Sequence, residues 1–163
     1  MNIILIGLPG SGKTTMARYL SRRLKRSWRD SDAQVEKNHG LGIPEIFRLH
    51  GEEQFRRWET EALQALGKQE NLVVSTGGGA VERNAELLRN SGYVIYLKRR
   101  VEDILPFVKG EGRPLLADSA DRETKLRTLA ARREPMYEQT AHAVIENTGS
   151  IEKVLEKIME VLP

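Results

Sequence analysis

The chain alternates between short apolar runs and longer stretches in which apolar residues recur at helical spacing. Residues 2–7 form an apolar run that ends in glycine, which is typical of a strand buried on both faces. Further strands are predicted over 72–75, 93–97 and 143–146, and a second strand should end near Asp30. The helical periodicity predicts helices over 12–24, 32–38, 43–50, 52–66, 84–90, 121–139 and 151–161, and one from about residue 101.

Strands that alternate with helices need crossover connections, and these connections produce a parallel sheet with helices on both faces. The pattern therefore predicts an α/β fold, a doubly wound parallel sheet. Periodicity alone does not indicate the order of the strands. No repeat and no linker rich in Pro, Gly or Ser divides the chain, so we interpret residues 1–163 as a single domain.

The composition excludes several classes of protein. Hydrophobic residues make up 39% and charged residues 30%, the balance of a globular chain. No apolar run could span a bilayer, the opening lacks the basic region of a signal peptide, and without cysteine no disulfide can form. We therefore expect a cytoplasmic protein. The net charge of +3 is too small to indicate nucleic acid, and scattered arginines favour a small polyanionic ligand.

The first predicted strand leads into Gly-Leu-Pro-Gly-Ser-Gly-Lys-Thr, which matches the phosphate-binding loop, or P-loop, of nucleotide-binding proteins. Its glycines let backbone N–H groups point inward around phosphates, and the next helix directs its positive dipole end at the anion. Lys13 would supply charge to the β and γ phosphates, and the Thr14 hydroxyl would ligate Mg²⁺. The candidate nucleotide-binding residues are Gly10, Ser11, Gly12, Lys13, Thr14 and Thr15.

Nucleotide binding alone leaves the reaction open. The sequence has no Asn/Thr-Lys-x-Asp motif, which a switch GTPase would need, and a motor ATPase would need a longer chain. The strand over 72–75 is followed by Thr76 and Gly77 rather than by an acidic residue, so the second acid for a metal must come from elsewhere. Small size, scattered arginines and a basic, glycine-containing segment near 109–114 favour a kinase for a small acceptor.

Asp30 and Asp32 lie where the second strand should end. Ligands of parallel sheets bind at the carboxyl ends of the strands, so both acids should lie near the P-loop. They could divide the work, one toward Mg²⁺ and its water and the other toward an acceptor hydroxyl, whose proton a carboxylate can accept. An N-cap at Asp32, which opens the next helix, would explain that residue equally well.

Six motifs occur here in the order seen in shikimate kinases, and the resemblance extends from the first strand to the last helix. They are Gly-Leu-Pro-Gly-Ser-Gly-Lys-Thr-Thr, Asp-Ser-Asp, Gly-Glu-Glu-Gln-Phe-Arg-Arg-Trp-Glu, Thr-Gly-Gly-Gly-Ala-Val, Arg-Pro-Leu-Leu and Arg-Arg-Glu-Pro-Met-Tyr. The resemblance implies a P-loop kinase with five strands in the order 2-3-1-4-5, like nucleoside monophosphate kinases. It also implies phosphorylation of the 3-hydroxyl of shikimate with ATP and Mg²⁺, a step toward chorismate.

The resemblance implies roles for single residues as well. Asp32 would hold the hydroxyls of shikimate and act as the base, with Lys13 as a second catalytic residue, while Asp30 and Thr14 would serve the metal. Without the resemblance, the arginines would be interpreted as ordinary surface residues of helices, and the triple glycine could be a simple loop. The planar guanidinium group of arginine, however, suits the binding of a substrate carboxylate. The implied substrate-binding residues are Asp32, Phe55, Arg56, Glu59, Gly77, Gly78, Gly79 and Arg133.

The resemblance further implies substrate-binding helices at about 32–66 and a lid at about 109–120, from which Arg113 would close over the phosphates as a catalytic and nucleotide-binding residue. One departure concerns adenine: the family usually has a stacking arginine where this chain has Pro106, and Lys109 is a poorer stacking group. Residues 146–148 follow the last strand, where the family has its adenine-side loop. We interpret Trp58 and Tyr137 as packing residues.

Two other interpretations remain open at this point. A gluconate or nucleotide kinase would share the P-loop, although its pocket has no evident need for Asp-Ser-Asp together with the triple glycine. A non-catalytic nucleotide-binding module is the second alternative, against which the retention of Asp30, Asp32, Arg113 and Arg133 argues. We expect a small-molecule substrate, shikimate, no nucleic acid or membrane partner, and a monomer.

Overall fold

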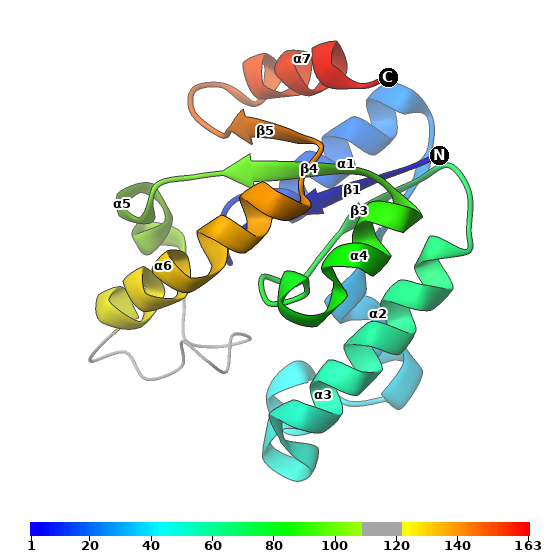
Figure 1. The fold of residues 1–163 in the computed structure, drawn as a ribbon, viewed down its shortest axis with the longest axis vertical. Helices are drawn as coiled ribbons and strands as arrows, with labels where there is room; N and C mark the ends of the chain where they lie inside the picture. The colour runs from blue at the N-terminus through cyan, green and yellow to red at the C-terminus, as the bar shows by residue number, and fades with distance from the viewer. Residues whose placement is uncertain (109–121) are drawn as a thin grey trace.

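A computed structural model describes residues 1–108 and 122–163 of the chain. In these ranges five parallel strands form one sheet in the order β2-β3-β1-β4-β5 (Figure 1). The strands are β1 (Asn2–Ile6), β2 (Ser27–Asp30), β3 (Leu72–Ser75), β4 (Gly92–Lys98) and β5 (Ala143–Glu146). The doubly wound α/β fold and the strand order that the resemblance implied are therefore confirmed.

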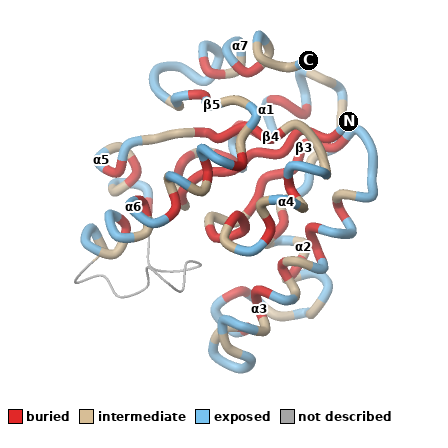
Figure 2. Tube along the Cα trace, in the orientation of Figure 1, coloured by how far each residue is buried: buried red, intermediate tan, exposed pale blue. Residues whose placement is uncertain are grey.

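Helices cover both faces of the sheet (Figure 1). On one face lie α1 (Lys13–Leu24) and α7 (Ile151–Val161), and on the other lie α4 (Val81–Ser91), α6 (Arg122–Thr140) and the C-terminal end of α3 (Ile43–Gly67). Alternate residues of β1 explain this arrangement, since Ile4 and Ile6 pack toward α4 and α6 while Ile3 and Leu5 pack toward α1 and α7. Figure 2 shows the buried residues along the strands and the inner sides of these helices.

The helix α2 (Ser31–His39) and the first half of α3 project from the sheet and have a small apolar core of their own. This core contains Val35, Ile43, Ile46, Phe55 and Ala62. Within α3, Gly51 has a left-handed φ of 82°, so the predicted break between two helices at this glycine is confirmed. Residues of both helices line the cavity described below.

Two helix boundaries differ from the prediction in informative ways. The helix predicted over 84–90 begins at Val81, because Asn84 lies at a kink (φ −125°) that its side chain bridges by donating to the carbonyl of Ala80. The helix from 101 is short: α5 (Val101–Ile104) passes into a 3₁₀ turn, Leu105–Phe107, that contains Pro106. The predicted lid lies outside the described residues, and no described helix has the length and hydrophobicity of a membrane span.

Candidate active site

A cavity of about 1080 Å³ opens at the carboxyl ends of the central strands, where parallel sheets bind ligands. It reaches from the P-loop to the projecting helices α2 and α3, and α5 and α6 close its sides. The predicted site residues that line it are Gly10, Gly12, Lys13, Thr14, Thr15, Asp30, Asp32, Phe55, Arg56, Glu59, Gly77, Gly78, Gly79 and Arg133. The structure thus brings together residues from five separate segments of the chain.

The P-loop has the backbone shape that its glycines allow. Gly10 and Gly12 have left-handed φ angles of 78° and 95°, which side chains larger than hydrogen rarely adopt. The Lys13 ammonium donates to the carbonyl oxygens of Gly7 at 2.7 Å and Leu8 at 2.8 Å, so its charge is held at the centre of the loop. This concave shape with a central cation suits phosphate oxygens.

The loop after β5 supports the P-loop from the other side. Asn147 donates from Nδ2 to the carbonyl oxygen of Ser11 at 2.7 Å, and its backbone N–H donates to Lys98 on the neighbouring strand. A β-carbon at Gly12 would lie 2.5 Å from Nδ2 of Asn147, so this glycine is needed for the close approach. Asn147 is therefore a structural support for the phosphate site in addition to lining the cavity.

Thr14 and Asp30, the two candidate metal ligands, lie within hydrogen-bond distance of each other. The Thr14 hydroxyl donates to Oδ2 of Asp30 at 3.2 Å and lies 3.3 Å from the hydroxyl of Ser75 at the end of β3. Among the described residues, no group of three or more acidic or histidine side chains is arranged so that it could hold a metal ion by itself. One carboxylate and one hydroxyl fit Mg²⁺, which completes its octahedron with phosphate oxygens and water in such enzymes.

The capping role belongs to Asp30 and not to Asp32. Oδ1 of Asp30 accepts a hydrogen bond from the backbone N–H of Ala33 at 3.0 Å, so Asp30 is the N-cap of α2. The N-cap interpretation of Asp32 was wrong, because the helix already begins at Ser31, one residue before Asp32. Asp32 lies in the first turn, and its Oδ1 is buried without a hydrogen-bond partner among the described residues.

The electrostatic environment of Asp32 favours a proton acceptor near neutrality. Burial raises the pKa of its carboxyl to about 7, and the nearby charges of Glu59 and Asp30 act in the same direction. Lys13 and Arg56 oppose the rise but do not cancel it. A carboxylate with a pKa near the working pH is what general base catalysis requires.

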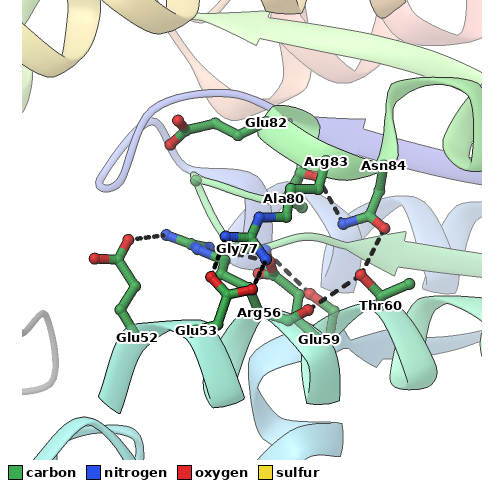
Figure 3. Close-up of polar contacts among 12 residues, drawn as sticks. Glu52, Glu53, Arg56, Glu59, Thr60, Gly77, Ala80, Glu82, Arg83 and Asn84 are labelled. Atoms are coloured by element: carbon green, nitrogen blue, oxygen red, sulfur yellow. Dashed lines mark hydrogen bonds and ion pairs between the residues drawn. The ribbon is translucent and has the colours of Figure 1, made fainter.

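Arg56 and Arg133 are buried rather than exposed, with relative exposures of 6% and 2%. Nη1 of Arg56 donates to Oε1 of Glu59 at 3.0 Å (Figure 3), and the pKa of Glu59 is raised by burial. Arg133 is held through Nε and Nη2 by Oε2 of Glu82 on α4, at 3.0 and 2.9 Å. Each guanidinium is thus oriented by a carboxylate while it lines the cavity, which suits a clamp for a substrate carboxylate.

Close contacts explain all three glycines after β3. A β-carbon at Gly77 would lie 2.7 Å from Oδ1 of Asp32, and one at Gly78 would lie 2.7 Å from Cδ of Pro9. A β-carbon at Gly79 would lie 2.5 Å from Nη2 of Arg56. The triple glycine is therefore not a simple loop, because each member makes room for a different side of the site.

The family comparison points to the same chemistry. The family model described as shikimate kinase matches residues 9–163. The chain belongs to the shikimate kinase family. It is 44% identical over 168 residues to the shikimate kinase of Symbiobacterium thermophilum, covering 99% of this chain and 96% of the relative. It is also 43% identical to that of Nitrosospira multiformis over 149 residues, 90% of this chain and 76% of the relative.

Solved structures of shikimate kinases share the fold. The enzyme from Acinetobacter baumannii, in complex with shikimate, superposes with a TM-score of 0.94 at 41% identity, covering 98% of this chain and 91% of that one. The Aquifex aeolicus enzyme gives a TM-score of 0.86 at 34% identity, with 98% and 95% covered. The protein is accordingly an ATP-dependent kinase that uses Mg²⁺. Membership favours the shikimate interpretation over a gluconate or nucleotide kinase and over a non-catalytic module.

Two residues of the site, Arg99 and Phe107, were not found from the sequence. Near the departure at Pro106, the Phe107 ring lines the cavity with 61% of the residue exposed, and the Arg99 guanidinium lies 4.9 Å from the ring centroid. Nη1 of Arg99 also donates to the P-loop carbonyl of Gly10 at 3.3 Å. The sequence signal that could have pointed to this site is the aromatic Phe107 directly after Pro106, the position where the family usually has an arginine. Lys109 and Arg113 lie outside the described residues.

The two residues interpreted as packing have different environments. Trp58 stacks on His39 with a centroid distance of 3.6 Å and an interplanar angle of 13°, which ties α3 to α2. Phe55 packs with Phe47 at a centroid distance of 5.1 Å and lines the cavity. Tyr137 is fully buried in the core, but its hydroxyl also bonds to the triple-glycine loop.

Proposed function

We propose that this chain transfers the γ-phosphoryl group of ATP to the 3-hydroxyl of shikimate, with Asp32 as the base. The observation that carries the proposal is the buried, unpartnered Oδ1 of Asp32, which lines the same cavity as the P-loop Lys13. Asp32 would accept the hydroxyl proton as the new oxygen–phosphorus bond forms and the bond from the γ-phosphorus to the bridging oxygen breaks. ADP and shikimate 3-phosphate would then leave.

The acceptor end of the cavity would hold the carboxylate and hydroxyls of shikimate. Arg56 and Arg133 come from α3 and α6 on two sides of the cavity, so they can grip one carboxylate from two directions. Glu59 would orient Arg56, and Phe55 would pack against the carbon ring. The backbone groups of residues 77–79 would complete the contacts, since glycines allow the substrate to approach the main chain.

The donor end would hold ATP along the P-loop, residues 10–15. Thr14 and Asp30 would hold Mg²⁺, which when bound neutralises charge on the β and γ phosphates. Lys13 would add its charge to the same phosphates. The Phe107 ring and the Arg99 guanidinium, which line the cavity together with Asn147, would provide the surface for adenine, since aromatic and guanidinium planes stack on bases.

We further assign residues 32–66 as substrate-binding helices and 109–120 as a lid that brings Arg113 over the phosphates. The small apolar core shared by α2 and α3 supports the first assignment, because it holds the two helices together where they line the cavity. We also propose that the enzyme is monomeric and cytoplasmic and that it has no nucleic-acid or membrane partner. The absence of cysteine and the modest net charge support it.

One coupled assay tests the reaction. ADP release should rise sharply when shikimate is added, and not with gluconate or a nucleoside monophosphate. Asp32→Asn should lower kcat by about 10²- to 10⁴-fold while ATP binding measured by calorimetry persists. Glu61→Gln, at an exposed carboxylate of α3, is the matched control and should keep wild-type activity. Turnover of gluconate or a nucleotide with none of shikimate would overturn the proposal.

A further inference from the structure

Tyr137 connects the helix α6 to the triple-glycine loop. Its ring is fully buried between α6 and the sheet, and its hydroxyl donates to the carbonyl oxygen of Gly78 at 2.6 Å. Burial holds the pKa of the phenol above its ordinary value, so the hydroxyl keeps its proton and remains a donor. This bond joins residues 59 positions apart in the chain.

Gly78 in turn rests directly on the P-loop. A β-carbon at this position would lie 2.7 Å from Cδ and 3.2 Å from N of Pro9, so no atom separates the two backbones. On either side, Gly77 adjoins Asp32 and Gly79 adjoins Arg56. A shift of the Gly78 carbonyl would therefore also move Gly77 and Gly79, the glycines that lie against Asp32 and Arg56.

The same turn of α6 carries Arg133, four residues before Tyr137 and buried with it. Pro135 lies between them and has no N–H to donate to the carbonyl of residue 131, so one helical hydrogen bond is missing there. The position of this turn then depends more on contacts outside the helix. The Tyr137 hydroxyl and the Arg133–Glu82 ion pair provide two such contacts.

We infer that Tyr137 is a positioning residue for the phosphoryl transfer: its hydroxyl fixes the Gly78 carbonyl and thereby keeps the triple-glycine loop in register with Arg133 and the P-loop. The inference rests on the proposed function, because it assigns to Tyr137 the placement of the groups that would bind shikimate. Tyr137 itself touches no substrate atom in this scheme.

The neighbouring Tyr96 offers a matched control. Its ring packs against that of Tyr137 with a centroid distance of 5.0 Å and is equally buried. Its hydroxyl, however, has no hydrogen-bond partner among the described residues. Replacing either tyrosine by phenylalanine keeps the ring pair, but only the change at residue 137 removes a bond to the site.

The test compares Tyr137→Phe, Tyr137→Leu and Tyr96→Phe by steady-state kinetics and thermal melting. We expect Tyr137→Phe to raise KM for shikimate about tenfold, since the partly buried Gly78 carbonyl loses its donor, with KM for ATP within about twofold of wild type. Tyr137→Leu should show the same KM effect and a lower melting temperature, and Tyr96→Phe should change neither constant.

A wild-type KM for shikimate in both Tyr137 variants would overturn the inference, as would an equal rise in Tyr96→Phe. A variant that lowers the melting temperature without changing KM would reduce Tyr137 to a packing residue and would also overturn it. Wild-type enzyme that fails to phosphorylate shikimate would instead refute the proposed function, so the two failures are distinguishable.

Discussion

The carboxylates of Asp32 and Glu59 meet beside the α-carbon of Gly77. A β-carbon there would lie 2.7 Å from Oδ1 of Asp32 and 3.1 Å from Oε2 of Glu59, and both oxygens are buried without a hydrogen-bond partner among the described residues. Burial raises the pKa of both groups, and the negative charge of Glu59 raises the pKa of Asp32 further. The proposed base is thus tuned by a residue that also orients Arg56.

This relationship predicts the pH dependence of the reaction. Only the ionised carboxylate of Asp32 can accept a proton, so kcat/KM for shikimate should rise with pH and level off above about 7. Glu59→Gln removes a negative charge beside Asp32, so the inflection of the kcat/KM profile should move to lower pH. The same substitution should raise KM, because it removes the carboxylate that holds Arg56. The profile is measured from about pH 5 to about pH 9, with Glu86→Gln on α4 as control. An inflection that stays in place in Glu59→Gln would show that the two carboxylates are not coupled.

The same pKa predicts an effect on stability. A carboxyl whose pKa rises on folding, here from 3.8 to about 7, stabilises the fold when protonated, and this contribution is lost as the pH rises through 7. Asp32→Asn should therefore increase the free energy of unfolding at about pH 8 by on the order of 2 kcal/mol, with a smaller gain at lower pH. Urea unfolding of the ligand-free protein measures it.

Asp103→Asn is the control for that measurement. The hydrogen bond from Arg100 lowers the pKa of this partly exposed carboxyl, so the substitution should bring no gain in stability at about pH 8. An Asp32→Asn protein no more stable than wild type at this pH, or one whose advantage grows toward acid, would contradict the raised pKa.

Much of the fold follows from patterns that act locally. The apolar run of β1 predicts a strand buried on both faces, and Gly51 predicts the break in α3, because each depends on the residues themselves. The kink at Asn84 was missed because it depends on a bond to the carbonyl of Ala80. Local sequence indicates where helices lie more reliably than where they begin.

The site was predicted less completely, because its roles depend on partners far away in the chain. Asp30 and Asp32 look equivalent locally, and they are distinguished by Thr14 on α1 and by Glu59 on α3. Likewise, Arg133 resembles a surface residue until Glu82 of α4 is placed beside it. Only the resemblance to a known family pointed to these residues from the sequence.

The third glycine of the loop yields a prediction about substrate affinity. Because a β-carbon at Gly79 would lie 2.5–2.6 Å from the terminal nitrogens of Arg56, Gly79→Ala should displace that guanidinium. We expect KM for shikimate to rise at least about tenfold, while KM for ATP changes little. Gly42→Ala, whose nearest neighbour would lie at an ordinary 3.4 Å, is the control. Equal effects on both KM values would indicate a general loss of structure instead.

Nucleotide affinity should depend on Phe107, which occupies the turn where the family's stacking arginine is replaced by Pro106. The ring is 61% exposed, so removing it costs the core little, and Arg99 already lies over it. Phe107→Ala should raise KM for ATP by about 5- to 150-fold, the equivalent of about 1–3 kcal/mol for a stacked base, and leave KM for shikimate near wild type. Leu49→Ala, at another large apolar residue with 53% exposure, controls for the loss of surface hydrophobicity. An ATP KM that is unchanged in Phe107→Ala but raised in Arg99→Ala would assign adenine contact to the guanidinium alone.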